Sequence, residues 1–346
     1  PAQVALLAPF SGAEAAAQAR DIEAAARMAL EGFPPGLVDL RVYDTAADPA
    51  RAAAAAEQAV SEGASLILGP LFAAEAQAVS PVAQRLGVQA LALTPFSGAA
   101  SGSTVVLGFA PENEVERVLQ YAVSQGMQNF AVVYPQEQYG EIVAQAAATA
   151  APRAGGRLVV QLSYPRSQQG VQEATASGAP SIIASGADAV LIAEGSGLEF
   201  LASFLAFHDV LPSRFQYLGT STWENQRPSA ASTTVGGWFA TRDPDRSAAF
   251  VQRFRARTGR APVGVAALGY DAAVVAATLA QDGRAAGEAA PFTRQRLTAA
   301  TAFPGATGPL RIGPDGVARR GLAVMEVTEG GFVVRDPAPA VLAPAS

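Results

Sequence analysis

The sequence contains no cysteine and no lysine, and it has one histidine among 346 residues. The missing cysteine excludes disulfides and thiolate chemistry, and it is compatible with either side of a membrane. Zinc sites of the usual kind need clustered histidine and cysteine, so they are excluded in practice. A phosphate-binding loop of the Walker type needs a lysine and is excluded as well. We therefore expect neither a metal nor a cofactor.

Long apolar runs and an excess of positive charge are also missing. No stretch of about 18 uncharged apolar residues occurs, so we expect no membrane span. The net charge of −6 and the isoelectric point near 5.0 argue against a nucleic-acid partner or an anionic membrane surface. All 24 basic residues are arginine, which we attribute to codon usage in a GC-rich genome, because alanine, glycine and proline are abundant too.

Short apolar runs alternate with alanine-rich amphipathic stretches along the chain. Half of the residues are hydrophobic, and a chain of this length can form two cores. The first series has apolar runs at residues 4–7, 40–43, 65–68 and 89–93, and the second extends from 130–134 to 215–219. Asp48 before Pro49 predicts a helix start between two of these runs. The alternation predicts an α/β fold in which helices cover both faces of parallel sheets.

Three extended stretches connect or follow the two series. The first meets Pro111, and the others are "GGWFATRDPD" and "FPGATGPLRIGPDG". They predict two Rossmann-like lobes joined by three crossings, with residues 1–111 and 241–307 in one lobe and 112–240 and 308–336 in the other. The proline-rich residues 337–346 are expected to form a flexible tail.

No residue set typical of an enzyme is present. His208 stands at a helix end, where a cation suits the helix dipole, and no second histidine accompanies it. "EGSGLEF" has Phe200 where a dinucleotide fingerprint needs its third glycine, and no Gly-x-Ser-x-Gly elbow occurs. We therefore expect a binding protein rather than an enzyme.

Hydroxyls, amides and aromatic rings follow the expected strands. Ligands of parallel α/β sheets bind outside the carboxyl ends of the strands. Ser11 follows the first strand, Tyr139 follows the run at 130–134, and Trp223 follows the last run of the second series. The helix N-termini behind these loops offer unpaired N–H groups. These loops predict a site for a small molecule, with Tyr139 and Trp223 as its walls.

Eight segments in order and spacing resemble the type I periplasmic binding proteins of the leucine/isoleucine/valine-binding class. They include "VALLAPFSG", "VYDTAADPARAAAAAEQAVSEGASLILGP", "VVYPQEQYG" and "AALGYDAAVVAATLA", and the resemblance covers nearly the whole length. It implies two lobes that close on a small-molecule ligand, an ABC permease as partner and a periplasmic location. Lipid anchoring of the full-length protein is left open.

The binding residues of that family match this sequence unevenly. The serines and threonines that hold a ligand carboxylate correspond here to Phe72, Ala73, Ala74 and Glu75, which carry no hydroxyl. The acid that pairs the ligand ammonium falls on Ser221, with Glu194 or Glu224 as substitutes. The α-amino-acid fingerprint is therefore broken, and leucine, isoleucine and valine are expected to bind weakly. The expected ligand-binding residues are Ser11, Phe72, Ala73, Ala74, Phe96, Ser97, Tyr139, Glu194, Ser221, Trp223 and Tyr270.

Several of these residues have a structural alternative. Ser11 could cap a helix, Tyr139 could pack the start of its helix, and Tyr270 has the helical spacing of a core residue with Leu268 and Val274. Both interpretations of each residue stay open at this point.

A second resemblance leads to a different function. "FAPENEVERV" and "GATGPLRIGPDGVARR" are similar to the C-terminal domain of penicillin-binding protein activators. This resemblance implies the same fold without a transported ligand and a peptidoglycan synthase as protein partner. The leading hypothesis is a receptor that delivers a small polar or aromatic-compatible ligand to an ABC importer, and the activator is the alternative.

Overall fold

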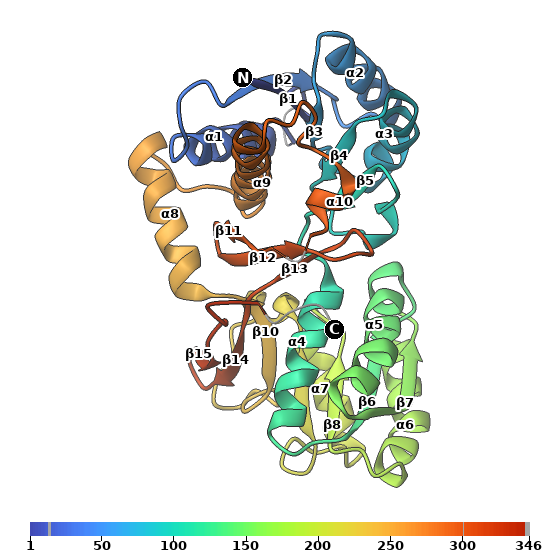
Figure 1. The fold of residues 1–346 in the computed structure, drawn as a ribbon. Coiled ribbons are helices and arrows are strands. Elements are labelled where there is room, and N and C mark those ends of the chain that lie inside the picture. Colours follow the sequence, from blue (N-terminus) through green and yellow to red (C-terminus); the bar gives the residue numbers. More distant parts are fainter. Residues whose placement is uncertain (13–14, 300, 343–346) are drawn as a thin grey trace. The chain divides into compact units, whose positions relative to one another are not determined.

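A computed structural model describes residues 1–12, 15–299 and 301–342 (Figure 1). The chain divides into two compact units. Unit 1 contains residues 1–110, 244–321 and those from Ala340 onward, and unit 2 contains residues 111–243 and 322–339. Each unit is built on a sheet of mainly parallel strands with helices on both faces, which confirms the predicted α/β class.

The sheet of unit 1 is parallel throughout and has the strand order β2-β1-β3-β4-β5. Its strands are β1 (Ala2–Ala8), β2 (Val38–Asp44), β3 (Leu66–Leu68), β4 (Gln89–Ala92) and β5 (Thr104–Val106). The helices around it are α1 (Ala15–Leu30), α2 (Pro49–Ser61), α3 (Ala73–Leu86) and α9 (Ala266–Ala286).

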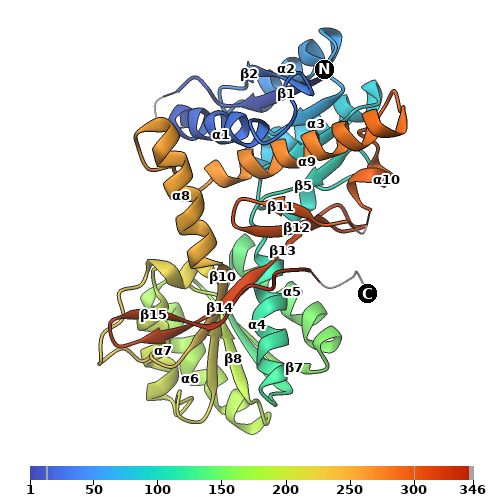
Figure 2. The ribbon, with the colours of Figure 1, turned by 60° about the vertical axis from the view of Figure 1, so that its left-hand side comes forward.

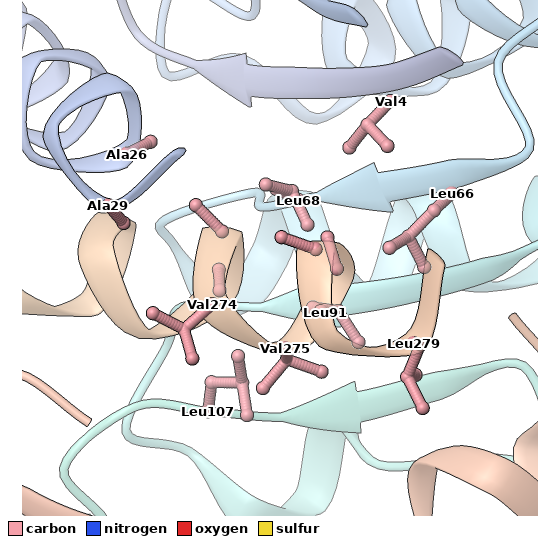
Figure 3. Packing of buried hydrophobic residues seen from close by; sticks show 14 of the residues in the cluster. Val4, Ala26, Ala29, Leu66, Leu68, Leu91, Leu107, Val274, Val275 and Leu279 are labelled. Carbon is pink, nitrogen blue, oxygen red and sulfur yellow. The ribbon is translucent and has the colours of Figure 1, made fainter. Parts of the chain in front are cut away.

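Alternation along the strands explains why helices cover both faces of this sheet. Val4 and Leu6 of β1 belong to the core that contains α1 and α9, whereas Ala5 and Leu7 pack with α2 and α3. Figure 3 shows side chains of α9, among them Val275, in the first of these cores beside the strands. The alanines of α1 and α9 let these two helices approach closely.

Three further elements complete unit 1. Helix α8 (Pro244–Thr258) packs on α1 through Phe250 and Phe254, and α10 (Arg294–Leu297) is a single turn. The strands β11 (Phe303–Gly305), β12 (Gly308–Ile312) and β13 (Ala318–Arg320) form a small antiparallel sheet. Leu310 and Ile312 of this sheet are buried in the core with α9. Residues 308–321 therefore lie in unit 1, whereas the sequence assigned them to the second lobe.

The sheet of unit 2 has the order β15-β14-β10-β9-β8-β6-β7. Five strands are parallel, namely β6 (Asn129–Pro135), β7 (Arg157–Tyr164), β8 (Ala189–Ile192), β9 (Gln216–Gly219) and β10 (Trp238–Arg242). The last two, β14 (Leu322–Thr328) and β15 (Gly331–Asp336), run antiparallel (Figure 2).

Helices cover both faces of this second sheet as well. Phe130 and Val132 of β6 pack with α4 (Pro111–Ser124) and α5 (Gln138–Ala154). Ala131 and Val133 face the opposite core, which contains α6 (Gln168–Ala184) and α7 (Leu198–Phe207). The carboxyl ends of β6, β7 and β8 lead into the first turns of α5, α6 and α7.

The start of the expected flexible tail packs on unit 2. Ala338 is buried, and its N–H donates to Asp243 Oδ2 over 3.4 Å. Residues 343–346 of the expected tail lie outside the described residues. Among the helices that are described, none is both long and apolar enough to cross a membrane. The described part of the chain also has no group of three acidic or histidine side chains that could hold a metal ion.

Candidate functional site

A chain of hydroxyl groups runs along the carboxyl edge of the unit 2 sheet. Tyr139 Oη, at the start of α5, lies 2.6 Å from Thr220 Oγ1, which follows β9. Thr220 Oγ1 lies 2.9 Å from Thr222 Oγ1, and the Thr222 hydroxyl donates to the backbone carbonyl of Glu194 over 3.1 Å. The ends of β6, β8 and β9 are thus joined by polar groups at the edge where ligands of such sheets bind.

Tyr139 is half-buried at this edge. Burial raises the pKa of its phenol, although the bond with Thr220 lowers it. Its ring packs beside the core between the sheet and α4 and α5, as the structural alternative expected. Its hydroxyl at the same time belongs to the polar chain, so the ring and the hydroxyl have separate roles.

The carboxylate of Glu194 is satisfied by groups of the protein. It is 3% exposed and accepts hydrogen bonds from the Tyr164 hydroxyl and from the N–H groups of Gly195 and Gly197. Arg166 forms an ion pair with it at 3.3 Å. Burial and this carboxylate raise the pKa of Tyr164. Glu194 holds the loop after β8, and this arrangement argues against a role as the ammonium partner of a ligand.

The acidic group next to Ser221 is Glu114. The Ser221 N–H donates to Glu114 Oε2 over 3.0 Å, and Glu114 lies in the first turn of α4 with 8% exposure. The pKa of Glu114 is raised to about 7, chiefly by burial and to a smaller extent by the charge of Glu224, although the Ser221 hydrogen bonds lower it. Glu224 itself accepts a hydrogen bond from the Thr241 hydroxyl.

Glu114 was missed by the sequence analysis as a site residue. The segment "PENEVERV" signals only a helix start, because acids are common in the first turn of a helix. The two residues that meet are 107 positions apart in the chain. No pattern local to either of them indicates the contact.

Trp223 lies inside unit 2. Its side chain has no exposed surface, and its indole N–H donates to the Ile192 carbonyl over 3.3 Å. The ring stands 6.0 Å from that of Phe239 and fills space that side chains at Gly219 and Gly237 would need. This burial argues against the expectation that Trp223 forms a wall of the site, since no face of the ring is left for a ligand.

In unit 1, Ser11 holds the loops after β1 and β2 together. Its N–H and hydroxyl donate to the two oxygens of Asp44 over 3.0 and 2.7 Å. Asp44 also accepts from the Ala46 N–H and pairs with Arg51 at 3.0 Å. Partial burial would raise the pKa of Asp44, but these hydrogen bonds and Arg51 lower it. The Ser11 hydroxyl is therefore engaged within unit 1.

The N-terminus of α3 is occupied by a carboxylate of the chain. Glu75 is buried, and its Oε2 accepts the Phe72 N–H over 3.2 Å. Burial raises the pKa of Glu75. Ala73 and Ala74, the first residues of the helix, add no hydroxyl. Because this carboxylate already takes one of the free N–H groups that a ligand anion would use, the position disfavours a ligand carboxylate.

The remaining expected residues pack within unit 1. Phe96 lies over Gly98 and against the small core around Ala76, and Ser97 begins the short 3₁₀ helix Ser97–Ala99. Tyr270 is half-buried, with the Phe250 ring 5.9 Å away. The structure therefore brings Tyr139, Glu194 and Ser221 together in unit 2. It places Ser11, Phe72–Ala74, Phe96 and Ser97 after the strands of unit 1 and Tyr270 on α9.

The sequence also matches a protein family. The model of the periplasmic binding protein family matches residues 1–331, which is nearly the whole chain. The chain belongs to this family, as the first resemblance indicated.

Solved structures share the fold at low sequence identity. A putative branched-chain amino acid ABC transporter protein from Rhodospirillum rubrum is 22% identical, with a TM-score of 0.78 over 96% of this chain and 99% of that one. A substrate-binding protein from Desulfitobacterium hafniense, in complex with Leu, is 18% identical, with a TM-score of 0.65 over 96% and 99%. A solute-binding protein from R. palustris, in complex with benzoate, is 17% identical, with a TM-score of 0.59 over 98% and 97%.

One curated protein is similar over a shorter stretch. The penicillin-binding protein activator LpoA of Yersinia pestis is 28% identical over 134 residues, which are 38% of this chain. The matched stretch covers 20% of that protein. The chain thus corresponds to a limited part of this relative.

Proposed function

We propose that this chain is a periplasmic receptor that binds a small polar or aromatic-compatible ligand, without catalysis, for an ABC importer. The chain of hydroxyls from Tyr139 through Thr220 and Thr222, at the carboxyl edge of the unit 2 sheet, carries the proposal. It offers donors and acceptors on adjacent strand ends, in a chain of the periplasmic binding protein family. The proteins similar in fold include one in complex with leucine and one in complex with benzoate.

A thermal-shift screen tests whether the chain binds a small molecule. The panel contains benzoate, 3,4-dihydroxybenzoate, amino acids, nucleosides and sugars. A ligand at 100 times its dissociation constant is expected to add about 2.7 kcal/mol to the stability of the folded chain. For domains of this size, that corresponds to a rise of roughly 5–10 °C in melting temperature. Tyr139→Phe, which removes only the hydroxyl, should weaken binding of any hit, and an unchanged affinity would place the ligand elsewhere.

Leucine, isoleucine and valine are expected to bind weakly or not at all. In the pattern of the resembling family the ligand carboxylate is held at the N-terminus of α3, where Glu75 already accepts the Phe72 N–H, and the acid that pairs the ligand ammonium falls on Ser221, which carries no charge. A missing charge-assisted hydrogen bond costs about 1.5–3 kcal/mol, or roughly tenfold to hundredfold in affinity. Calorimetry with leucine checks this, and micromolar binding would show that another acid, such as Glu114, takes the ammonium.

A second function is supported by the similarity to the penicillin-binding protein activator. In this case the chain would act by contact with a peptidoglycan synthase, and the occupied α3 N-terminus would reflect the loss of a transported ligand. The two functions predict opposite results. A screen without any thermal shift, together with direct binding of the chain to a penicillin-binding protein from the same organism, would favour the activator.

A further inference from the structure

The sheet of unit 2 ends in an open strand edge. Among the described residues β15 pairs only with β14, and Figure 2 shows it at the outer end of the sheet. Val333 and Val334 of this strand are 49% and 45% exposed. On the opposite edge of the same sheet, the exposed residues of β7 are the polar Arg157 and Gln161. The β15 edge is therefore the more apolar of the two.

The hydrogen bonds of β14 show which backbone groups of β15 point outward. The Val327 N–H donates to the Gly237 carbonyl, and the Val327 carbonyl accepts the Gly236 N–H, so neither group bonds to β15. Val327 is opposite Phe332, and hydrogen-bonded and non-hydrogen-bonded pairs alternate along an antiparallel ladder. The N–H and carbonyl groups of Phe332 and Val334 therefore point away from β14, and no residue in the described ranges bonds to them.

The charged side chains of β15 do not protect this edge. Natural edge strands are often protected from pairing by a charge, most often a lysine, and the chain has no lysine. The Arg335 guanidinium lies 5.8 Å from the centre of the Trp238 ring on β10 and pairs with Glu326 of β14 at 3.4 Å. Asp336 pairs with Arg117 of α4. Both charges are thus directed back over unit 2, away from the open edge.

The outward groups define a two-fold register with a second copy of β15. With Phe332 of one copy opposite Val334 of the other, each such pair exchanges both of its N–H···O=C bonds around an axis at Val333. Val333 is then opposite its own counterpart, and aromatic and β-branched residues are favourable cross-strand neighbours. Arg335 is opposite Gly331, so no like charges meet across the two strands. The irregularity of the β14–β15 ladder comes after Val334, outside these pairs.

We propose that unit 2 associates with a second copy of this chain through β15, edge to edge and antiparallel, so that the two sheets become continuous. A second copy fits this edge because the same six residues supply complementary bonding groups and apolar neighbours in the two-fold register. Pairing along one short edge buries little surface, and small interfaces are typical of weak complexes. A dimer that forms at high micromolar concentration is therefore expected. The inference goes beyond the proposed receptor function and does not depend on it.

Single cysteines test the register directly, because the chain has no cysteine of its own. In the proposed register Val333 faces itself in a non-hydrogen-bonded pair, with Cα atoms about 4.5 Å apart, a separation that a disulfide can span. On mild oxidation at high micromolar concentration, Val333→Cys is expected to give a disulfide-linked dimer on non-reducing gels. Val42→Cys, at an exposed valine of the edge strand β2 in unit 1, is the control and should give at least tenfold less dimer.

Sedimentation velocity measures the association without a crosslink. Val334→Pro removes an N–H that points outward, so the β14–β15 hairpin keeps its own bonds while the dimer loses some, and the dissociation constant should rise at least tenfold. Val333→Lys, which places like charges opposite each other, should have the same effect, whereas Val42→Lys should change the dissociation constant less than twofold.

Three results would overturn the proposal. One is equal crosslinking of Val333→Cys and Val42→Cys, and another is a dissociation constant that Val333→Lys leaves unchanged, because either would place the contact elsewhere. The third is a wild-type chain that stays monomeric at millimolar concentration, which would leave the edge to an extended segment of another protein. Circular dichroism of each variant shows whether the fold is retained.

Discussion

Replacing Trp223 by alanine is expected to lower the free energy of unfolding of unit 2 by about 3–5 kcal/mol. The ring has no exposed surface, and it lies among Gly219, Gly237 and Phe239. Its removal leaves a cavity and an Ile192 carbonyl that has lost the indole donor. Urea unfolding followed by circular dichroism measures the change.

A control in the same unit separates burial from aromatic character. Phe207, at the end of α7, is 77% exposed, and Phe207→Ala should change stability by less than about 0.5 kcal/mol. Should Trp223→Ala cost no more than Phe207→Ala, the ring would be a surface group, and its original interpretation as a ligand wall would return. A large loss of stability would mean instead that any reduction in ligand binding by Trp223→Ala is caused by impaired folding of unit 2 and not by the loss of a ligand contact.

The parts of the structure that could be predicted from sequence are those set by local pattern. Short apolar runs that alternate with alanine-rich amphipathic stretches predicted parallel sheets with helices on both faces, and each sheet has helices on both faces. Asp48 caps α2 as predicted, and its Oδ1 accepts the Arg51 N–H over 2.7 Å. Periodicity and capping are properties of a few neighbouring residues, so a single sequence is enough to detect them.

The candidate site could not be predicted in the same way, because it is formed by contacts between residues that are distant in the sequence. The segment "TSTWENQ" is polar, yet its tryptophan is buried, because Gly219 at the end of β9 and Gly237 just before β10 leave room for the ring. Glu194 stands where a ligand contact was expected, but its carboxylate is bound by Tyr164 at the end of β7 and by Arg166 in the loop that follows. Residue type alone indicated which groups could bind a ligand. It could not indicate which of them the protein itself already satisfies.

The crossing near residue 308 illustrates the same limit. The glycine-rich stretch was correctly read as extended, but extended backbone can pair with either unit. Pairing of β12 with β11 and β13, together with the burial of Leu310 and Ile312 against α9, places it in unit 1. The chain leaves unit 1 only after Gly321.

Glu114→Gln is expected to stabilise unit 2 at pH 8 and to have little effect at pH 4.5. The pKa of Glu114 is raised from 4.5 to about 7 in the folded chain, chiefly by burial. Between these values the folded state holds a proton that the unfolded state has released, so stability falls as the pH rises through this window. The loss in the free energy of unfolding is complete above pH 7, and a pKa shift of this size corresponds to a loss of at most roughly 3 kcal/mol.

Glutamine isolates the charge because its amide oxygen can still accept the Ser221 N–H. Urea unfolding of both proteins at pH 4.5, 6 and 8 should show a gain for the variant that grows with pH. Glu173→Gln, an exposed change on α6, serves as the control and should give no pH-dependent difference. An equal gain at all three pH values would mean that the glutamine improves packing, and that Glu114 is not a buried acid that ionises near neutral pH. A ligand that donates a hydrogen bond to Glu114 should reduce the stability difference between the variant and the wild-type chain at pH 8. Such a ligand would stabilise the buried charge of the Glu114 carboxylate, which the variant lacks.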